Sequence, residues 1–126
     1  MSHVSRVKTK LKNIDKNLLK RTSEIVSKEL NVKAKYLPNA TTKRGRYVTI
    51  ESEYGILLIN NEPIGFVKVG DSIEIRADTY VLSENIINKI VDIYIAVAIA
   101  EVASVLGYQV TEYSTSQSSV NMVIMR

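Results

Sequence analysis

The spacing of hydrophobic and polar residues predicts two helices separated by short strands. Helical spacing runs over residues 16–30, after the N-cap residue Asp15, and over residues 84–106, between Ser83 and Gly107. The runs with strand-like patterns lie before, between and after these helices. They are residues 3–11, 32–37, 47–53, 54–59, 64–69, 72–79, 108–113 and 120–125.

This order predicts one α+β domain over residues 1–126. We expect a two-layer sandwich of order β-α-β-β-β-β-α-β-β, in which both helices pack on one face of a mostly antiparallel sheet. Residues 38–46 contain Pro and Gly and predict a loop. Residues 47–80 predict a meander of three or four strands, and residues 3–11 predict a strand in the sheet interior. The continuous apolar run 54–59 is typical of a strand covered on both faces or lying at an interface.

The predicted helix at 84–106 has more apolar surface than one sheet face can cover. Its outer side begins polar and turns apolar toward the C-terminal end when residues are placed at 100° intervals. The polar part is Asn85, Asn88, Lys89 and Asp92, and the apolar part is Ile95, Ala96, Ile99 and Ala103. A two-layer domain has no third layer for this side, so we expect a homodimer or another protein partner there. The alternative is that the loop at residues 37–46 folds over it.

Three polar residues are candidates for buried or functional groups. Glu101 lies among apolar residues on the opposite side of the same helix, where an unpaired carboxylate costs several kcal/mol. We expect it to bond to a hydroxyl such as that of Tyr108 or to a cation such as His3 or Arg6, or to reach the edge of the sheet. Asp78 shares one side of a predicted strand with Glu74, which indicates either a small acidic metal cluster or, more commonly, a solvent-facing strand side. His3 is the single histidine.

The composition excludes several kinds of chemistry. The chain has no Cys and one His, so disulfide frameworks, zinc ribbons, iron–sulfur clusters, thiol nucleophiles and multi-histidine metal sites are excluded. Its five glycines form neither a phosphate-binding nor a dinucleotide-binding pattern. We therefore expect a non-enzymatic binding or assembly module that uses no metal and no cofactor.

The two parts of the chain differ in charge. Residues 1–50 hold 13 Lys and Arg against 3 Asp and Glu, whereas residues 51–126 hold 4 against 10. The resulting charges of +10 and −6 favour contact with a polyanion, a membrane surface or a self-complementary assembly, unless the fold interleaves the two parts.

A nucleic-acid-binding surface is the alternative function. It would use the cations of the first part, with Tyr36 and Tyr47 stacking on bases. These cations are Arg6, Lys8, Lys10, Lys12, Lys33, Lys35, Lys43, Arg44 and Arg46. No sequence pattern of a common RNA-binding or helix-turn-helix module accompanies them.

Neither a membrane span nor a signal peptide is predicted. The longest unbroken apolar run, residues 93–100, is far shorter than the about 20 residues that a span needs. The first residues contain no apolar segment typical of a signal peptide. We therefore expect a cytoplasmic protein with no membrane partner.

Short matches distributed along the chain resemble one known family. They are Met1 to Thr9, Ile64-Gly65-Phe66, Ala77-Asp78, Ile90, Tyr94, Gly107-Tyr108-Gln109-Val110 and Val123-Ile124-Met125-Arg126. By these residues the chain resembles the uncharacterised cyanobacterial and plastid family called hypothetical chloroplast reading frame thirty-five. The resemblance implies a small domain of the same fold and no particular activity. Within it, His3, Asp78 and Glu101 are the first positions to test for a role beyond packing.

Overall fold

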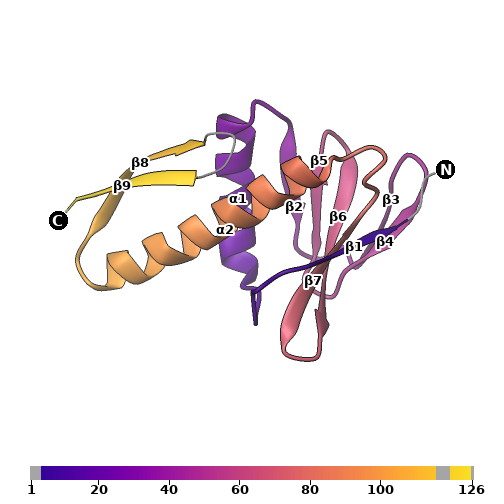
Figure 1. Cartoon of the computed structure of the whole chain (residues 1–126), viewed down its shortest axis with the longest axis horizontal. Helices are drawn as coiled ribbons and strands as arrows, with labels where there is room; N and C mark the ends of the chain where they lie inside the picture. The colour runs from indigo at the N-terminus through magenta and orange to yellow at the C-terminus, as the bar shows by residue number, and fades with distance from the viewer. Residues whose placement is uncertain (1–3, 116–119, 126) are drawn as a thin grey trace.

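The computed structural model describes residues 4–115 and 120–125 and shows the predicted α+β fold. Two helices, α1 (Lys16–Glu29) and α2 (Glu84–Val105), cover one face of a five-stranded antiparallel sheet (Figure 1). The strands are β1 (Ser5–Lys8), β2 (Ala34–Leu37), β3 (Thr42–Arg44), β4 (Thr49–Glu51), β5 (Ile56–Ile59), β6 (Glu62–Val69), β7 (Ser72–Ala77), β8 (Gln109–Thr115) and β9 (Val120–Met125). Asp15 and Ser83 cap the two helices, because their side chains accept hydrogen bonds from backbone N–H groups of the first turn.

The central sheet has the strand order β1-β7-β6-β5-β2, and every neighbouring pair is antiparallel. β5, β6 and β7 form a meander, as predicted. β1 pairs with β7 but lies at the edge of the sheet, so the prediction of an interior strand is wrong. Arg6 and Lys8 suit this edge, since charged side chains keep an unpaired strand side in water.

The sheet is covered by a second layer besides the helices, and this second layer lies over part of the opposite sheet face. Residues 42–51, predicted as a loop followed by a strand of the meander, form a separate hairpin of β3 and β4. Ile50 of this hairpin packs with Ile56 and Leu58 of β5 in a small second core. β5 is therefore buried on both faces, as its continuous apolar run predicts. β3 was not predicted because all of its residues are polar and exposed, which leaves no periodic signal.

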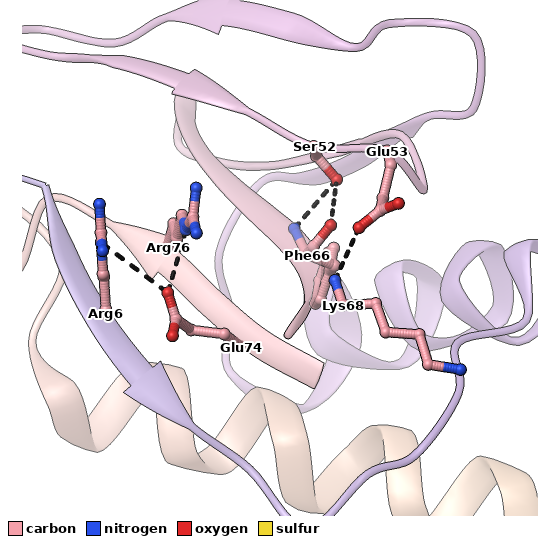
Figure 2. Close-up of polar contacts among 7 residues, drawn as sticks. All are labelled: Arg6, Ser52, Glu53, Phe66, Lys68, Glu74 and Arg76. Carbon is pink, nitrogen blue, oxygen red and sulfur yellow. Dashed lines mark hydrogen bonds and ion pairs between the residues drawn. The ribbon is translucent and has the colours of Figure 1, made fainter. Parts of the chain in front are cut away.

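Two side chains attach this second layer to the side of β6 that faces away from β7 (Figure 2). The buried Ser52 hydroxyl accepts a hydrogen bond from the Phe66 N–H at 2.9 Å and donates to the Phe66 carbonyl at 3.1 Å. The Glu53 carboxylate accepts from the Lys68 N–H at 2.7 Å. These side chains satisfy backbone groups that a neighbouring strand would otherwise pair.

α2 is longer than the sheet on which it packs. Its 22 residues span about 33 Å. Its second half extends away from the sheet toward β8 and β9, at the opposite end of the molecule from β3 and β4 (Figure 1). Gly107 ends the helix with a left-handed backbone at φ 89°. The predicted final hairpin is present, but it forms its own two-stranded sheet against the helices instead of joining the central one.

Two tyrosine hydroxyls connect the layers. Tyr94 of α2 accepts a hydrogen bond from the N–H of Asp15, at the start of α1, at 3.0 Å. Tyr36 of β2 donates to the Tyr54 carbonyl. Burial raises the pKa of both hydroxyls above the usual 10.0, and the nearby negative charge of Asp15 raises it further. At Tyr94 the N–H of Asp15 offsets part of this rise.

Gly65→Ala should lower the free energy of unfolding by roughly 2–3 kcal/mol, because it overpacks the crossing of β4 and β6. An added Cβ would lie 2.5 Å from the Glu51 carbonyl oxygen and 2.7 Å from Ile50 Cγ2. Urea unfolding followed by circular dichroism measures the change. Gly70→Ala is the comparison, since a Cβ there meets no atom within 4 Å and its cost is that of a left-handed backbone, about 1 kcal/mol. A smaller loss at Gly65 than at Gly70 would contradict the close approach.

The free energy of unfolding should fall as the pH rises above about 10. The folded chain holds the Tyr36 and Tyr94 protons more tightly than the unfolded chain does. The stabilisation is therefore complete below pH 10.0 and is lost as the pH rises through the raised pKa values of the folded state. Urea unfolding at several pH values between about 8 and 11.5 measures this decline. In Tyr94→Phe the decline should be shallower, and an unchanged slope would exclude a contribution from Tyr94.

Candidate functional site

Helix α2 changes the side on which it carries apolar residues halfway along its length. In its first half the apolar side chains face the sheet, and the exposed outer side is polar at Asn85, Asn88 and Asp92. In its second half the sheet-facing side continues into Glu101 and Ser104, which are polar and exposed. The outer side there carries the large aliphatic residues Ile95, Ile99, Val102 and Leu106, which we call the α2 stripe.

The α2 stripe lines an apolar groove of about 580 Å³. Leu11, which precedes α1, and Ile124 of β9 border the groove. The exposed fraction of the stripe residues ranges from 37% at Ile95 to 66% at Leu106. Among the described residues that line the groove, none is charged. A continuous aliphatic surface of this kind is unusual on a chain that acts alone.

The structure separates the four residues predicted for this outer side. Ile95 and Ile99 are exposed and line the groove, and Ala103 lies half-buried along it. Ala96 is buried by its own chain, so its placement on the outer side is wrong. It lies one residue and 100° beyond Ile95, toward the core. The loop of the alternative prediction, residues 37–46, does not cover this side. Residues 42–51 instead form the hairpin on the opposite face of the sheet.

The prediction that Glu101 is a buried carboxylate is also wrong. Glu101 is exposed and lines a hollow between α1, α2 and the start of β8. Asp15, Arg21 and Ser104 line the same hollow. The physical reason is the length of α2, because the second half of the helix extends beyond the sheet (Figure 1).

Asp78 is buried, with 2% of its surface exposed. Its Oδ1 accepts a hydrogen bond from the Tyr80 N–H at 3.0 Å, and its carbonyl accepts from the N–H groups of Val81 and Leu82. Its Oδ2 has no hydrogen-bond partner among the described residues. Asp78 therefore stabilises the turn that follows β7. His3, the remaining polar candidate, lies outside the described residues.

Several of the cations predicted for nucleic-acid binding lie on the side of the sheet that faces away from the helices, whereas Lys16, Lys20, Arg21 and Lys28 belong to α1 on the other side. Val7 packs toward the main core, so its neighbours Arg6 and Lys8 on β1 point to the other face. Tyr36 packs toward the same core, so Lys35 on β2 also points away from the helices. We call this side of the molecule the outer face. The remaining cations of the prediction are exposed on the β3–β4 hairpin or beside strand ends: Lys10, Lys12, Lys33, Lys43, Arg44 and Arg46.

Glu74 of β7 lies between two arginines on the outer face (Figure 2). Its Oε1 is 3.0 Å from Nε of Arg76 and 3.8 Å from Nε of Arg6. Only 7% of Glu74 is exposed, so the interpretation of this strand side as solvent-facing is wrong. The register sets Arg6 directly opposite Arg76, and the carboxylate between them offsets their repulsion.

An exposed aromatic pair lies at the edge of the outer face. Tyr47, in the β3–β4 turn, and Tyr80, after β7, contact each other edge to face with ring centroids 5.8 Å apart. The Arg46 guanidinium carbon is 5.7 Å from the centroid of Tyr47. Tyr36 is buried, so its predicted stacking role is wrong. Sequence reasoning missed Tyr80 because only the fold brings it beside Tyr47.

Within residues 4–115 and 120–125, no three His, Asp or Glu side chains are grouped so that they could hold a metal ion. No described helix is long and apolar enough to cross a membrane. No protein-family model, curated protein or solved structure matches the chain. The resemblance to the chloroplast reading frame family stays a prediction.

Glu74→Gln should lower the free energy of unfolding by about 1–2 kcal/mol, because it leaves Arg6 and Arg76 without their shared carboxylate. Urea unfolding at neutral pH measures the loss. Glu24→Gln is the matched control, since Glu24 pairs with Arg21 at 4.0 Å on an exposed helix surface, where such a pair contributes about 0.5 kcal/mol or less. Equal losses in the two variants would contradict the distinction between the buried and the exposed carboxylate.

Proposed function

We propose that the chain is a non-enzymatic assembly module that forms a homodimer through the α2 stripe. The observation that supports this is the row of aliphatic side chains that the second half of α2 leaves in water. The sheet and α1 cover the inner side of α2 only as far as Val97, and the β3–β4 hairpin lies on the far face of the sheet. A second chain would supply the cover that the described residues of the first chain do not.

The spacing of the α2 stripe fits the packing of two helices. Ile95, Ile99, Val102 and Leu106 follow one another at intervals of 4, 3 and 4 residues. This is the spacing of the apolar seam in coiled coils, where each large side chain enters a hole between residues of the facing helix. Ala98 and Ala103 also line the groove, and their small size leaves room for the side chains of a facing helix.

A second copy of the chain is the occupant that this surface fits best. In a two-fold dimer the same surface is used twice, so it has to be complementary to itself. An uncharged aliphatic stripe meets this requirement, since it places no like charges against each other. The apolar stripe of α1 is not available to another chain, because Leu19 and Val26 are buried in the main core.

The energetics predict a weak and reversible dimer. Full burial of a Val, Leu or Ile side chain contributes roughly 1.5–3 kcal/mol. The stripe and Ile124 are each about half exposed, so a dimer that covers them on both chains gains on the order of 10 kcal/mol. Association costs roughly 4–15 kcal/mol in lost freedom. With the lower of these costs the balance is about 6 kcal/mol, which corresponds to a Kd of roughly 40 µM, so the dimer forms at concentrations of tens of micromolar or higher.

The mass in solution should rise from 14.1 kDa toward twice that value as the concentration of the chain increases. Sedimentation equilibrium between about 10 µM and 1 mM measures this rise. Ile99→Asp should keep the chain monomeric over the whole range, because the dimer would bury an unpaired carboxylate on each side of the two-fold axis. Circular dichroism checks that the variant stays folded, which the exposure of Ile99 favours.

Val105→Asp provides the matched control. It introduces the same carboxylate in the same half of α2, at a residue that is 81% exposed and does not line the groove. The control should dimerise as the natural sequence does. A monomer at 1 mM for the natural sequence, or equal dimerisation by Ile99→Asp, would exclude the proposed interface.

A further inference from the structure

We propose that the outer face binds single-stranded nucleic acid, with Tyr47 and Tyr80 as the stacking platform. This surface lies at the other end of the molecule from the α2 stripe (Figure 1). The proposal therefore does not depend on the homodimer. It rests on the exposed aromatic pair, on the cations around it and on the partners that three acids of this face have within the fold.

The aromatic pair is held in place and yet open to solvent. Tyr47 is 48% exposed and Tyr80 is 70% exposed, although their rings contact each other. Neither ring belongs to a hydrophobic core. An exposed ring offers its face to any nucleobase, and each base that stacks contributes to affinity without regard to sequence. The guanidinium of Arg46 lies over one face of the Tyr47 ring, so a base stacks on Tyr47 only at the other face or in place of Arg46, and the displaced guanidinium can pair with the adjoining phosphate.

The cations form a path across the face from this pair. β4 crosses β6 at Gly65, where an added Cβ would meet the carbonyl oxygen of Glu51. The register places Gly65 of β6, Arg76 of β7 and Arg6 of β1 in one row across the sheet. The β3–β4 hairpin, which contains Tyr47 in its turn, therefore lies above this row. The exposed cations of β1 and of the hairpin are Arg6, Lys8, Lys43, Arg44 and Arg46. Phosphates spaced along a strand bind such a series of cations.

Three acids on this face already have partners within the fold. Glu74 is paired with Arg6 and Arg76, Glu62 accepts from the Arg46 N–H at 3.0 Å, and Glu53 accepts from the Lys68 N–H. Glu51 of β4 is exposed. The lysines of the face have no ion pair with the described acids. Glu51, Glu53 and Glu62 keep their charge, but the Lys and Arg residues of this face outnumber its four acids, so the surface that a ligand would meet has a net positive charge. These seven cations are Arg6, Lys8, Lys35, Lys43, Arg44, Arg46 and Arg76.

A single strand suits this surface better than a duplex. The bases of a duplex are stacked on one another and cannot lie on a protein ring without being flipped out. The bases of a single strand are free to do so. An acidic protein partner would use the cations, but it would not present a series of flat bases to stack on the two tyrosines.

Fluorescence anisotropy with a labelled mixed-sequence DNA of about 20 nucleotides tests the proposal, using the natural chain at low salt. We expect saturable binding that weakens steeply with salt, and at least about fivefold weaker binding of the same sequence as a duplex. Tyr47→Ala and Tyr80→Ala should each weaken binding roughly 5- to 50-fold. Both residues are exposed, and thermal unfolding checks that each variant is folded.

Charge-matched variants test whether binding depends on the outer face or only on the net charge of the chain. Lys43→Gln, on the outer face, should weaken binding several-fold and reduce the salt dependence by about one phosphate contact. Lys16→Gln removes the same charge from exposed α1, on the helix side, and should change binding by less than about twofold. Ile99→Asp should bind as the natural chain does.

Four results would overturn the proposal. One is the absence of saturable binding at about 200 µM chain and low salt. A second is equal binding of the duplex, or full binding by both tyrosine variants, because a platform for stacking would then be absent. A third is an equal effect of Lys16→Gln and Lys43→Gln. The fourth is displacement of the DNA by poly-glutamate as efficiently as by unlabelled DNA, which would indicate a surface for acidic proteins.

Discussion

The length of α2 relative to its sheet is the constraint on which the rest of the structure depends. A helix of 22 residues extends about 33 Å, and the sheet that it covers is five strands wide at about 4.8 Å per strand. The helix therefore continues past the sheet. Over the sheet its apolar residues face inward, and beyond the sheet they face the other way. One element thus builds the core of the domain and an apolar surface outside it.

The two faces of the sheet have different roles because different layers cover them. The helices bury one face and form the main core, whereas the β3–β4 hairpin covers only part of the other and leaves charged residues around it. Ser52 and Glu53 attach this second layer through side chains, so it lies over the sheet without joining it. The proposed self-association and nucleic-acid surfaces consequently lie at opposite ends of the molecule, and a dimer formed through α2 leaves both outer faces open.

The sequence predicted the secondary-structure elements and the main core, but it did not predict the contacts between distant segments. The helix spacing and both caps predicted α1 and α2, and the unbroken apolar run predicted that β5 is covered on two faces. The same reasoning predicted that Glu101 is buried and that Ala96 is exposed, and both predictions are wrong because they assumed a sheet as long as the helix. It missed Tyr80 as a partner of Tyr47, since no pattern in a single sequence reports a contact between two loops.

By itself, the sequence determined what depends on neighbours within a few residues: the helices, most of the strands, the caps, the apolar second half of α2 and the positive charge of the first fifty residues. Only the tertiary structure decided which of these features meet. It placed β1 at an edge beside β7, set Glu74 between two arginines, and moved residues 42–51 onto the outer face. The physical reason is that local spacing fixes the side on which a residue lies along its own element, whereas burial depends on which other element ends up against that side.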